Sequence, residues 1–214
     1  MRNFHYVFIF YVTLSACSNS ENQIRSELFS SEFKRLKLEN KLEVVNLDSV
    51  SNYDELVKKM SQIFCEDKVA GLQFQLNKIT YHVTGYSGCP TDEVVSCFFR
   101  RNLLTIRNDS LIFRERKSKP IEYLKTELKS IMSETYTYQY NENKLKPALF
   151  HLYVEDKYTI ATTKKVLKEI IEQFDTISKA NIPDFFKYDI LFNDYDVSNI
   201  PPPPPPNEEI KNEI

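Results

Sequence analysis

The second half of the chain carries the clearest alternation of apolar and polar positions. Leu104 and Ile106 face one way along an extended segment, and an apolar run over 111–113 follows the turn-forming Asn108 and Asp109. This pattern predicts a β-hairpin.

A helix is predicted after the hairpin, because apolar positions recur there at helical spacing: Ile121, Leu124, Leu128 and Ile131. Ser118 is its candidate cap, with Pro120 in the first turn.

Two further strands with a helix between them are predicted after residue 147. Phe150, Leu152 and Val154 alternate over 148–154 and predict a strand. A broad apolar stripe over 162–177 predicts a helix, and Pro183 separates it from a last strand. The apolar side of that strand is formed by Tyr188, Ile190 and Phe192.

The first half has a weaker pattern. Residues 18–42 are polar with scattered apolar positions, which predicts a tether merging into a short amphipathic helix. Ser51 or Asn52 is a candidate cap for a helix reaching about Glu66. Alternation over 72–76 and 79–83 changes phase at Asn77 and Lys78, which predicts a tight hairpin or a bulge. A turn over 85–90 and an extended stretch over 94–99 complete this half.

These elements predict an α+β fold with five regions. They are a leader over 1–16, a tether and short helix over 17–50, a helix with a β-hairpin over 51–102, an α+β domain over 103–193, and a polyproline and acidic tail over 194–214. The core of the prediction is a small mixed β-sheet with two helices on one face, extended by the N-terminal helix and hairpin.

The order strand, strand, helix, strand, helix, strand over 103–193 resembles the periplasmic domain of the ExbD/TolR family of biopolymer-transport proteins. The local likeness is the run 152–157, LYVEDK, leading into VLKEI at 166–170. The resemblance implies a small sheet able to dimerise or to grip a partner in the periplasm. Family members also have an N-terminal transmembrane helix with a buried aspartate, which this chain lacks. The resemblance therefore does not imply that this chain takes part in proton transduction.

Composition narrows the function further. Apolar residues make up 42% and charged residues 27%, as in an ordinary globular protein, and the formal net charge of −2 gives no field to gather nucleic acid. The three glycines, Gly71, Gly85 and Gly88, do not form a phosphate-binding loop or a nucleophile elbow. The histidines do not form an HExxH pair. No cofactor and no metal are expected.

The N-terminus indicates export. A basic start at Arg2 and an apolar run over 6–16, too short to span a bilayer, are typical of a signal sequence. The run ends in Leu14, Ser15, Ala16 and Cys17, which resembles the lipobox of bacterial lipoproteins. Lipidation of Cys17 would hold the mature chain on a membrane. Ser18 then favours the outer membrane, facing the periplasm. The alternatives are an ordinary secretory signal or an uncleaved anchor.

Three cysteines remain beyond Cys17. In an oxidising compartment the nearest pair, Cys89 and Cys97, is the candidate disulfide, which leaves Cys65 over. Zinc binding or redox chemistry by the three thiols is the alternative reading.

Two sets of residues are candidate partner contacts. Glu155 and Asp156 end a strand, where ligands often bind in parallel sheets, although adjacent carboxylates in an extended chain point apart. Pro201 to Pro206 form a polyproline rod, either a stiff spacer or a ligand for an aromatic groove. The strand phases predict that His82 and His151 both face away from the core.

The sequence therefore predicts a lipid-anchored envelope protein that acts as a protein-interaction or accessory module, and not an enzyme. Its expected partners are the membrane, other envelope proteins of a TonB- or Tol-like system, and a second copy of the chain. The alternatives are an enzyme with its site around Glu155 and Asp156, or a small-ligand-binding lipoprotein.

Overall fold

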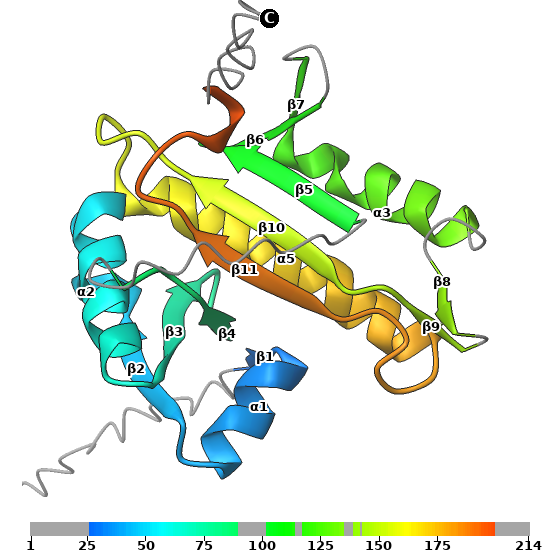
Figure 1. Cartoon of the computed structure of the whole chain (residues 1–214), viewed down its shortest axis with the longest axis horizontal. Helices are drawn as coiled ribbons and strands as arrows, with labels where there is room; N and C mark the ends of the chain where they lie inside the picture. The colour runs from blue at the N-terminus through cyan, green and yellow to red at the C-terminus, as the bar shows by residue number, and fades with distance from the viewer. Residues whose placement is uncertain (1–25, 90–101, 114–116, 135–138, 142, 200–214) are drawn as a thin grey trace, which may run out of the picture.

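The computed structural model describes residues 26–89, 102–113, 117–134, 139–141 and 143–199 (Figure 1). Within these ranges the chain has α-helices and mixed β-sheets, which confirms the α+β class. The hydrophobic core is continuous and is shared by both halves of the chain.

The first half forms a four-stranded mixed sheet. The strands lie in the order β1 (Ser26–Phe29), β4 (Ile79–Gly85), β3 (Val69–Leu76) and β2 (Leu42–Asn46). β3 and β4 are antiparallel, whereas β1 is parallel to β4 and β2 is parallel to β3. The predicted hairpin at Asn77 and Lys78 is confirmed, with φ values of 48° and 67°, the left-handed backbone that a two-residue hairpin turn needs.

Two helices connect the strands of this sheet. α1 (Ser31–Leu38) follows β1, and α2 (Tyr53–Cys65) follows the short η1 turn (Leu47–Ser49) after β2. The predicted cap of α2 is confirmed, because Asn52 Oδ1 accepts a hydrogen bond from Glu55 N at 2.9 Å. The prediction of a tether and helix before residue 50 missed β1 and β2, which are short and have few buried side chains.

The second half forms a five-stranded mixed sheet. The strands lie in the order β11 (Tyr188–Phe192), β10 (Ala148–Tyr153), β5 (Asn102–Arg107), β6 (Ser110–Ile112) and β7 (Ser118–Pro120). β5, β10 and β11 are parallel, and β6 and β7 are antiparallel neighbours. A small ladder of β8 (Gln139–Asn141) and β9 (Lys144–Leu145) precedes β10.

The two predicted helices of this half are α3 (Leu124–Ser133) and α5 (Ile160–Ala180); in Figure 1, α5 lies behind β10 and β11, and α3 lies beside β5. Burial of the apolar stripe of α5 contributes about 1.5 to 3 kcal/mol per large side chain. Its buried apolar residues are Val166, Leu167, Ile170, Ile171, Phe174 and Ile177.

The predicted start of the helix after the β5–β6 hairpin is wrong. Ser118 and Pro120 lie in β7, which pairs with β6, and a short η3 turn (Ile121–Tyr123) precedes α3. Pro120 is tolerated because β7 is an edge strand with an unpaired outer side among the described residues. The apolar stripe of Ile121, Leu124, Leu128 and Ile131 is buried as predicted.

The two sheets meet at Tyr86, directly after β4. Its backbone N–H donates to Ile190 O and its carbonyl accepts from Phe192 N, at 2.9 and 2.8 Å, so Tyr86 pairs with β11. Tyr53 of α2 adds a second connection: its hydroxyl donates to the carbonyls of Leu152 and Asn193, and its ring stacks on Phe192. The halves therefore form one body.

Candidate functional site

Several polar residues gather at the carboxyl ends of β5 and β10. These neighbouring parallel strands are in a register that places Arg107 beside Tyr153, two residues before Glu155. Since parallel strands end at the same edge, their following turns lie together. The chain after β11 also reaches this edge, where Asp196 directly precedes the η4 turn (Val197–Asn199).

Asn108 connects the turn after β5 to Glu155. Its backbone N–H donates to Tyr153 O at 2.8 Å, while its side-chain Oδ1 accepts from Glu155 N at 3.0 Å. Its Nδ2 group also donates to Glu155 Oε1 at 3.2 Å. The left-handed backbone of Asn108, with φ of 57°, is one that Asn adopts readily and allows the two-residue turn.

The Glu155 carboxylate is surrounded by donors. Lys157 Nζ lies 2.6 Å from Oε2 and Arg107 Nη2 lies 2.7 Å from Oε1. Lys157, Asn108 and Arg107, in that order of effect, lower the pKa of Glu155 to about 2. Glu155 is therefore ionised at neutral pH, far from the pKa that suits a general base.

Arg107 joins this cluster to the chain after β11. Its Nε lies 3.3 Å from Asp196 Oδ2, and the Asp196 side chain is only 12% exposed. Hydrogen bonding to Glu155 raises the pKa of Arg107 further above its usual value. The cluster is therefore a clamp between three segments: the end of β5 with its following turn, the residues directly after β10, and the residue that precedes η4.

Asp156 does not join Glu155. It is exposed, and the donors around Glu155 leave it out of the clamp. The two predicted contact residues are adjacent in sequence, but their side chains lie in different environments. A paired acid and base at these two positions has no support in this geometry.

The two histidines differ from each other. His151 faces away from the α5 side of the sheet, as predicted, and its Nδ1 lies 3.0 Å from Asn193 Oδ1. The prediction for His82 is wrong, because it is only 7% exposed and its ring stacks on Phe29 with centroids 4.0 Å apart. The reason is α1, which covers this second face of the first sheet and which strand phase does not reveal.

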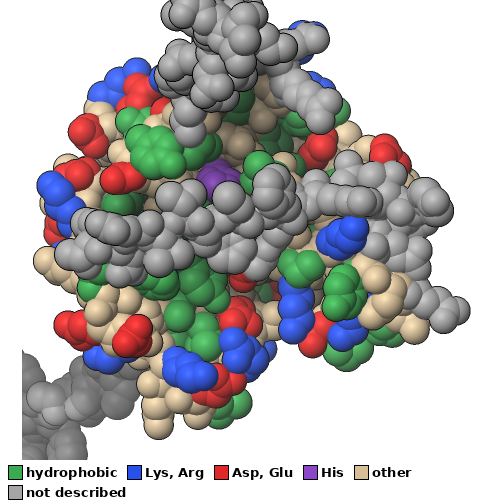
Figure 2. Space-filling model, in the orientation of Figure 1, with side chains coloured by type: hydrophobic (Ala, Val, Ile, Leu, Met, Phe, Trp, Pro, Cys, Tyr) green, Lys and Arg blue, Asp and Glu red, His purple; other side chains and the backbone are tan. Residues whose placement is uncertain are grey.

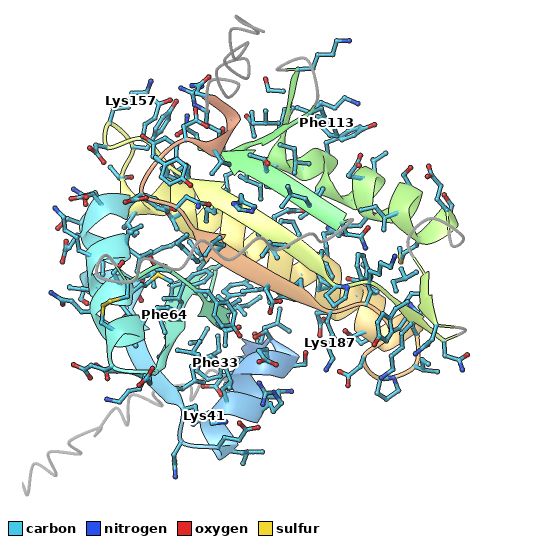
Figure 3. The ribbon with its side chains drawn as sticks, in the orientation of Figure 1. Phe33, Lys41, Phe64, Phe113, Lys157 and Lys187 are labelled. Atoms are coloured by element: carbon cyan, nitrogen blue, oxygen red, sulfur yellow. A yellow bond between two sulfur atoms is a disulfide. The ribbon has the colours of Figure 1, made fainter. Side chains whose placement is uncertain are left out.

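The predicted Cys89–Cys97 disulfide is also corrected. Cys89 is bonded to Cys65, with the two Cα atoms 5.2 Å apart (Figure 3). The hairpin of β3 and β4 returns the chain to the end of α2, so cysteines 24 positions apart become neighbours. Nearness in sequence was the wrong criterion. Cys97 lies outside the described residues, as do Cys17, Pro201 and Pro206.

A groove of about 340 Å³ lies between β2 and α2. β2 is at the edge of the first sheet, and no other strand among the described residues pairs with its outer side. An unpaired edge beside a groove can accept an extended segment by strand addition. Apart from the adjacent Val44 and Val45, no sequence pattern predicted this groove. The groove is lined by Glu43, Val44, Val45, Asn46, Ser49, Lys59, Gln62, Ile63 and Glu66.

Among the described residues, His, Cys, Asp and Glu side chains do not form a group of three or more that could hold a metal ion. In the same part of the chain, no helix combines the length and the apolar character needed to cross a bilayer. Comparisons of the chain with models of protein families, with curated proteins and with solved structures found no match.

Proposed function

We propose that this chain is a lipid-anchored protein of the bacterial cell envelope that acts as a protein-interaction or accessory module. Lipid on Cys17 anchors it, in our proposal at the outer membrane with the folded body in the periplasm. It performs no proton transduction of its own. The lipobox-like run of Leu14, Ser15, Ala16 and Cys17 is the sequence basis for the anchor.

The Cys65–Cys89 disulfide is the observation that carries this proposal. Structural disulfides form and persist in oxidising compartments such as the periplasm and are rare in the cytosol. A bonded pair within the folded body therefore supports export, independently of the N-terminal motif.

The order of elements in the second half supports a link to TonB- or Tol-like systems. β5, β6, α3, β10, α5 and β11 follow the strand and helix order of the ExbD/TolR periplasmic domain. The extra strand β7 and the β8–β9 ladder depart from that order, as does the whole first half. The link is therefore a proposal about partner class, and the alternative of an enzyme at Glu155 has less support because that carboxylate is clamped.

The first experiment tests the anchor. Cells producing the wild-type chain and the Cys17→Ala variant are fractionated, and the mature N-terminus is examined by mass spectrometry. We expect an acylated Cys17 and membrane fractionation for the wild type, and loss of both for the variant. A wild-type chain that keeps residues 1–16, or carries no fatty acid, contradicts the proposal.

The second experiment tests the interaction surface. We place the partner against the groove between β2 and α2, because extended segments bind unpaired strand edges. A photoreactive residue at Gln62, an exposed groove residue, should capture one defined envelope protein in intact cells. The matched control is Thr126, an exposed position on α3. Equal capture from both positions, or none from Gln62, contradicts this assignment.

A further inference from the structure

α1 has one buried side and one strongly exposed side. Phe33, labelled in Figure 3, and Leu36 are 1% and 3% exposed and pack on the first sheet. Phe33 leaves no space for a side chain at Gly71. The other side presents charged residues and Leu38, which is 87% exposed. Leu38 is the most exposed large apolar side chain among the described residues.

The exposed side of α1 is basic, although the whole chain has a formal net charge of −2. Between positions 31 and 41 there are four cations and two carboxylates: Lys34, Arg35, Lys37 and Lys41 against Glu32 and Glu39. Figure 2 shows Lys and Arg side chains, with some acidic ones, at the lower part of this face, where α1 lies.

The two carboxylates are already occupied. Arg35 bonds to both Glu32 and Glu39, and Lys41 Nζ lies 3.0 Å from Glu39 Oε2. Lys34 lies over the Phe29 ring, 5.7 Å from its centroid. Within the described ranges no carboxylate forms an ion pair with Lys34 or Lys37, and both lysines are exposed, as is Leu38.

The position of α1 in the chain brings this surface close to the proposed anchor. Eight residues, 18–25, separate Cys17 from Ser26, the first residue of β1, and α1 begins five positions later. At about 3.3 to 3.6 Å per residue, this segment reaches at most about 30 Å. A chain anchored at Cys17 therefore keeps α1 within reach of the lipid headgroups.

We propose that the exposed side of α1 docks on an anionic lipid bilayer, with Lys34 and Lys37 among the headgroups and Leu38 inserted at the boundary with the acyl chains. Basic residues near an anionic surface and an apolar side chain at the interface both favour this placement. The bilayer sets the orientation of the folded body, so that the side of the first sheet covered by α1 faces the membrane. The proposed orientation depends on the proposed lipid anchor at Cys17, whereas binding of the exposed side of α1 to anionic lipid does not.

The test uses a chain from residue 18, without the anchor and with the disulfide formed. Every described element begins at Ser26 or later, so this chain retains all of them. Cosedimentation with vesicles of phosphatidylethanolamine and phosphatidylglycerol is compared with vesicles of phosphatidylcholine. We expect binding to the anionic vesicles at low salt, and a loss on the order of 10-fold or more when Lys34→Ser and Lys37→Ser are combined. Leu38→Ser should weaken binding further.

The matched control is the pair Lys125→Ser and Lys129→Ser, exposed positions on α3 that change the net charge equally. Thermal unfolding checks that each variant is folded. Equal loss in the control, no binding at millimolar anionic lipid, or self-association that Leu38→Ser abolishes without any vesicle binding would overturn the proposal. Failure of Cys17 lipidation in cells would instead leave this vesicle result standing, so the two proposals fail separately.

Discussion

At the scale of single residues, His82 shows how an apolar setting controls a titratable group. Its ring is nearly parallel to that of Phe29, with an interplanar angle of 5°, and Phe33 packs at a tilt beside it. Neither ring nitrogen has a hydrogen-bond partner among the described residues. Glu27 Oε1 is 3.9 Å from Nε2, and Lys37 opposes its effect. Burial is the largest influence and lowers the pKa of His82.

We predict that His82 makes the protein less stable in mild acid. Because its pKa is lowered in the folded state, the unfolded chain binds the proton more readily, and the free energy of unfolding falls as pH drops below about 6.5. A single titrating group changes the free energy of unfolding by at most about 1.4 kcal/mol per pH unit. Urea unfolding at several pH values measures this.

The matched variant for that prediction is His82→Phe, which keeps an aromatic ring against Phe29 and removes the titration. It should flatten part of the pH dependence. Burial also lowers the pKa of His151, opposed by the hydrogen bond that its ring makes to Asn193 Oδ1, and this group should account for some of the remainder. An unchanged slope in His82→Phe would show that His82 does not titrate in this range.

Glu155 and Asp156 form a second test at this scale. Glu155→Gln removes the charge that Arg107, Asn108 and Lys157 contact, and should cost about 1 kcal/mol of unfolding free energy at pH 7, a modest value because the side chain keeps 22% exposure. Since its pKa is lowered to about 2, this contribution is lost as pH falls from about 4.5 toward 2. Asp156→Asn, at an exposed position, should change little.

At the scale of elements, the disulfide ties the end of α2 to the chain after β4. Cys65 is the last residue of α2, and Cys89 lies four positions beyond the end of β4. Between them the bond closes a loop that contains the whole β3–β4 hairpin. It therefore restricts the unfolded chain over most of the first sheet.

We predict that Cys65→Ser lowers the free energy of unfolding by about 3.5 kcal/mol, the chain-entropy value for a loop of this size. Cys97→Ser should leave both the disulfide and the stability unchanged. Peptide mapping under non-reducing conditions identifies the bonded pair. A Cys89–Cys97 peptide, or equal destabilisation by both substitutions, would contradict the pairing in the structure.

At the scale of the whole molecule, stability depends on the junction where β4 approaches β11. Gly85 ends β4, and a Cβ atom there would lie 2.6 Å from Met60 Cε and 2.7 Å from Phe192 Cε2. Those side chains come from α2 and β11, so a methyl group at this position would force Met60 and Phe192 to shift within the core. The close approach lets both sheets share one core.

Gly85→Ala should therefore destabilise the whole protein by about 1 to 3 kcal/mol, the usual cost of overpacking, in a single cooperative transition. Gly88→Ala is the matched control, because its Cβ would have no atom within 4 Å. Chemical denaturation followed by far-UV and near-UV signals measures both. Two separated transitions would show that the halves unfold independently.

The sequence by itself determined the elements with strong periodicity. The stripe of α5, the β3–β4 and β5–β6 hairpins, and the strands β10 and β11 follow from local alternation and turn residues, which depend only on nearby positions. The α+β class follows from them. Short β1 and β2 escaped prediction because their few residues carry no clear period.

Only the tertiary structure decided which distant residues meet. The Cys65–Cys89 bond, the burial of His82 beneath α1 and the clamp around Glu155 each join segments far apart in sequence. Strand order, register and the sheet faces covered by helices set these contacts. Local periodicity predicts none of these three features. Local physics therefore fixed the elements, and packing between them fixed the chemistry of the surface.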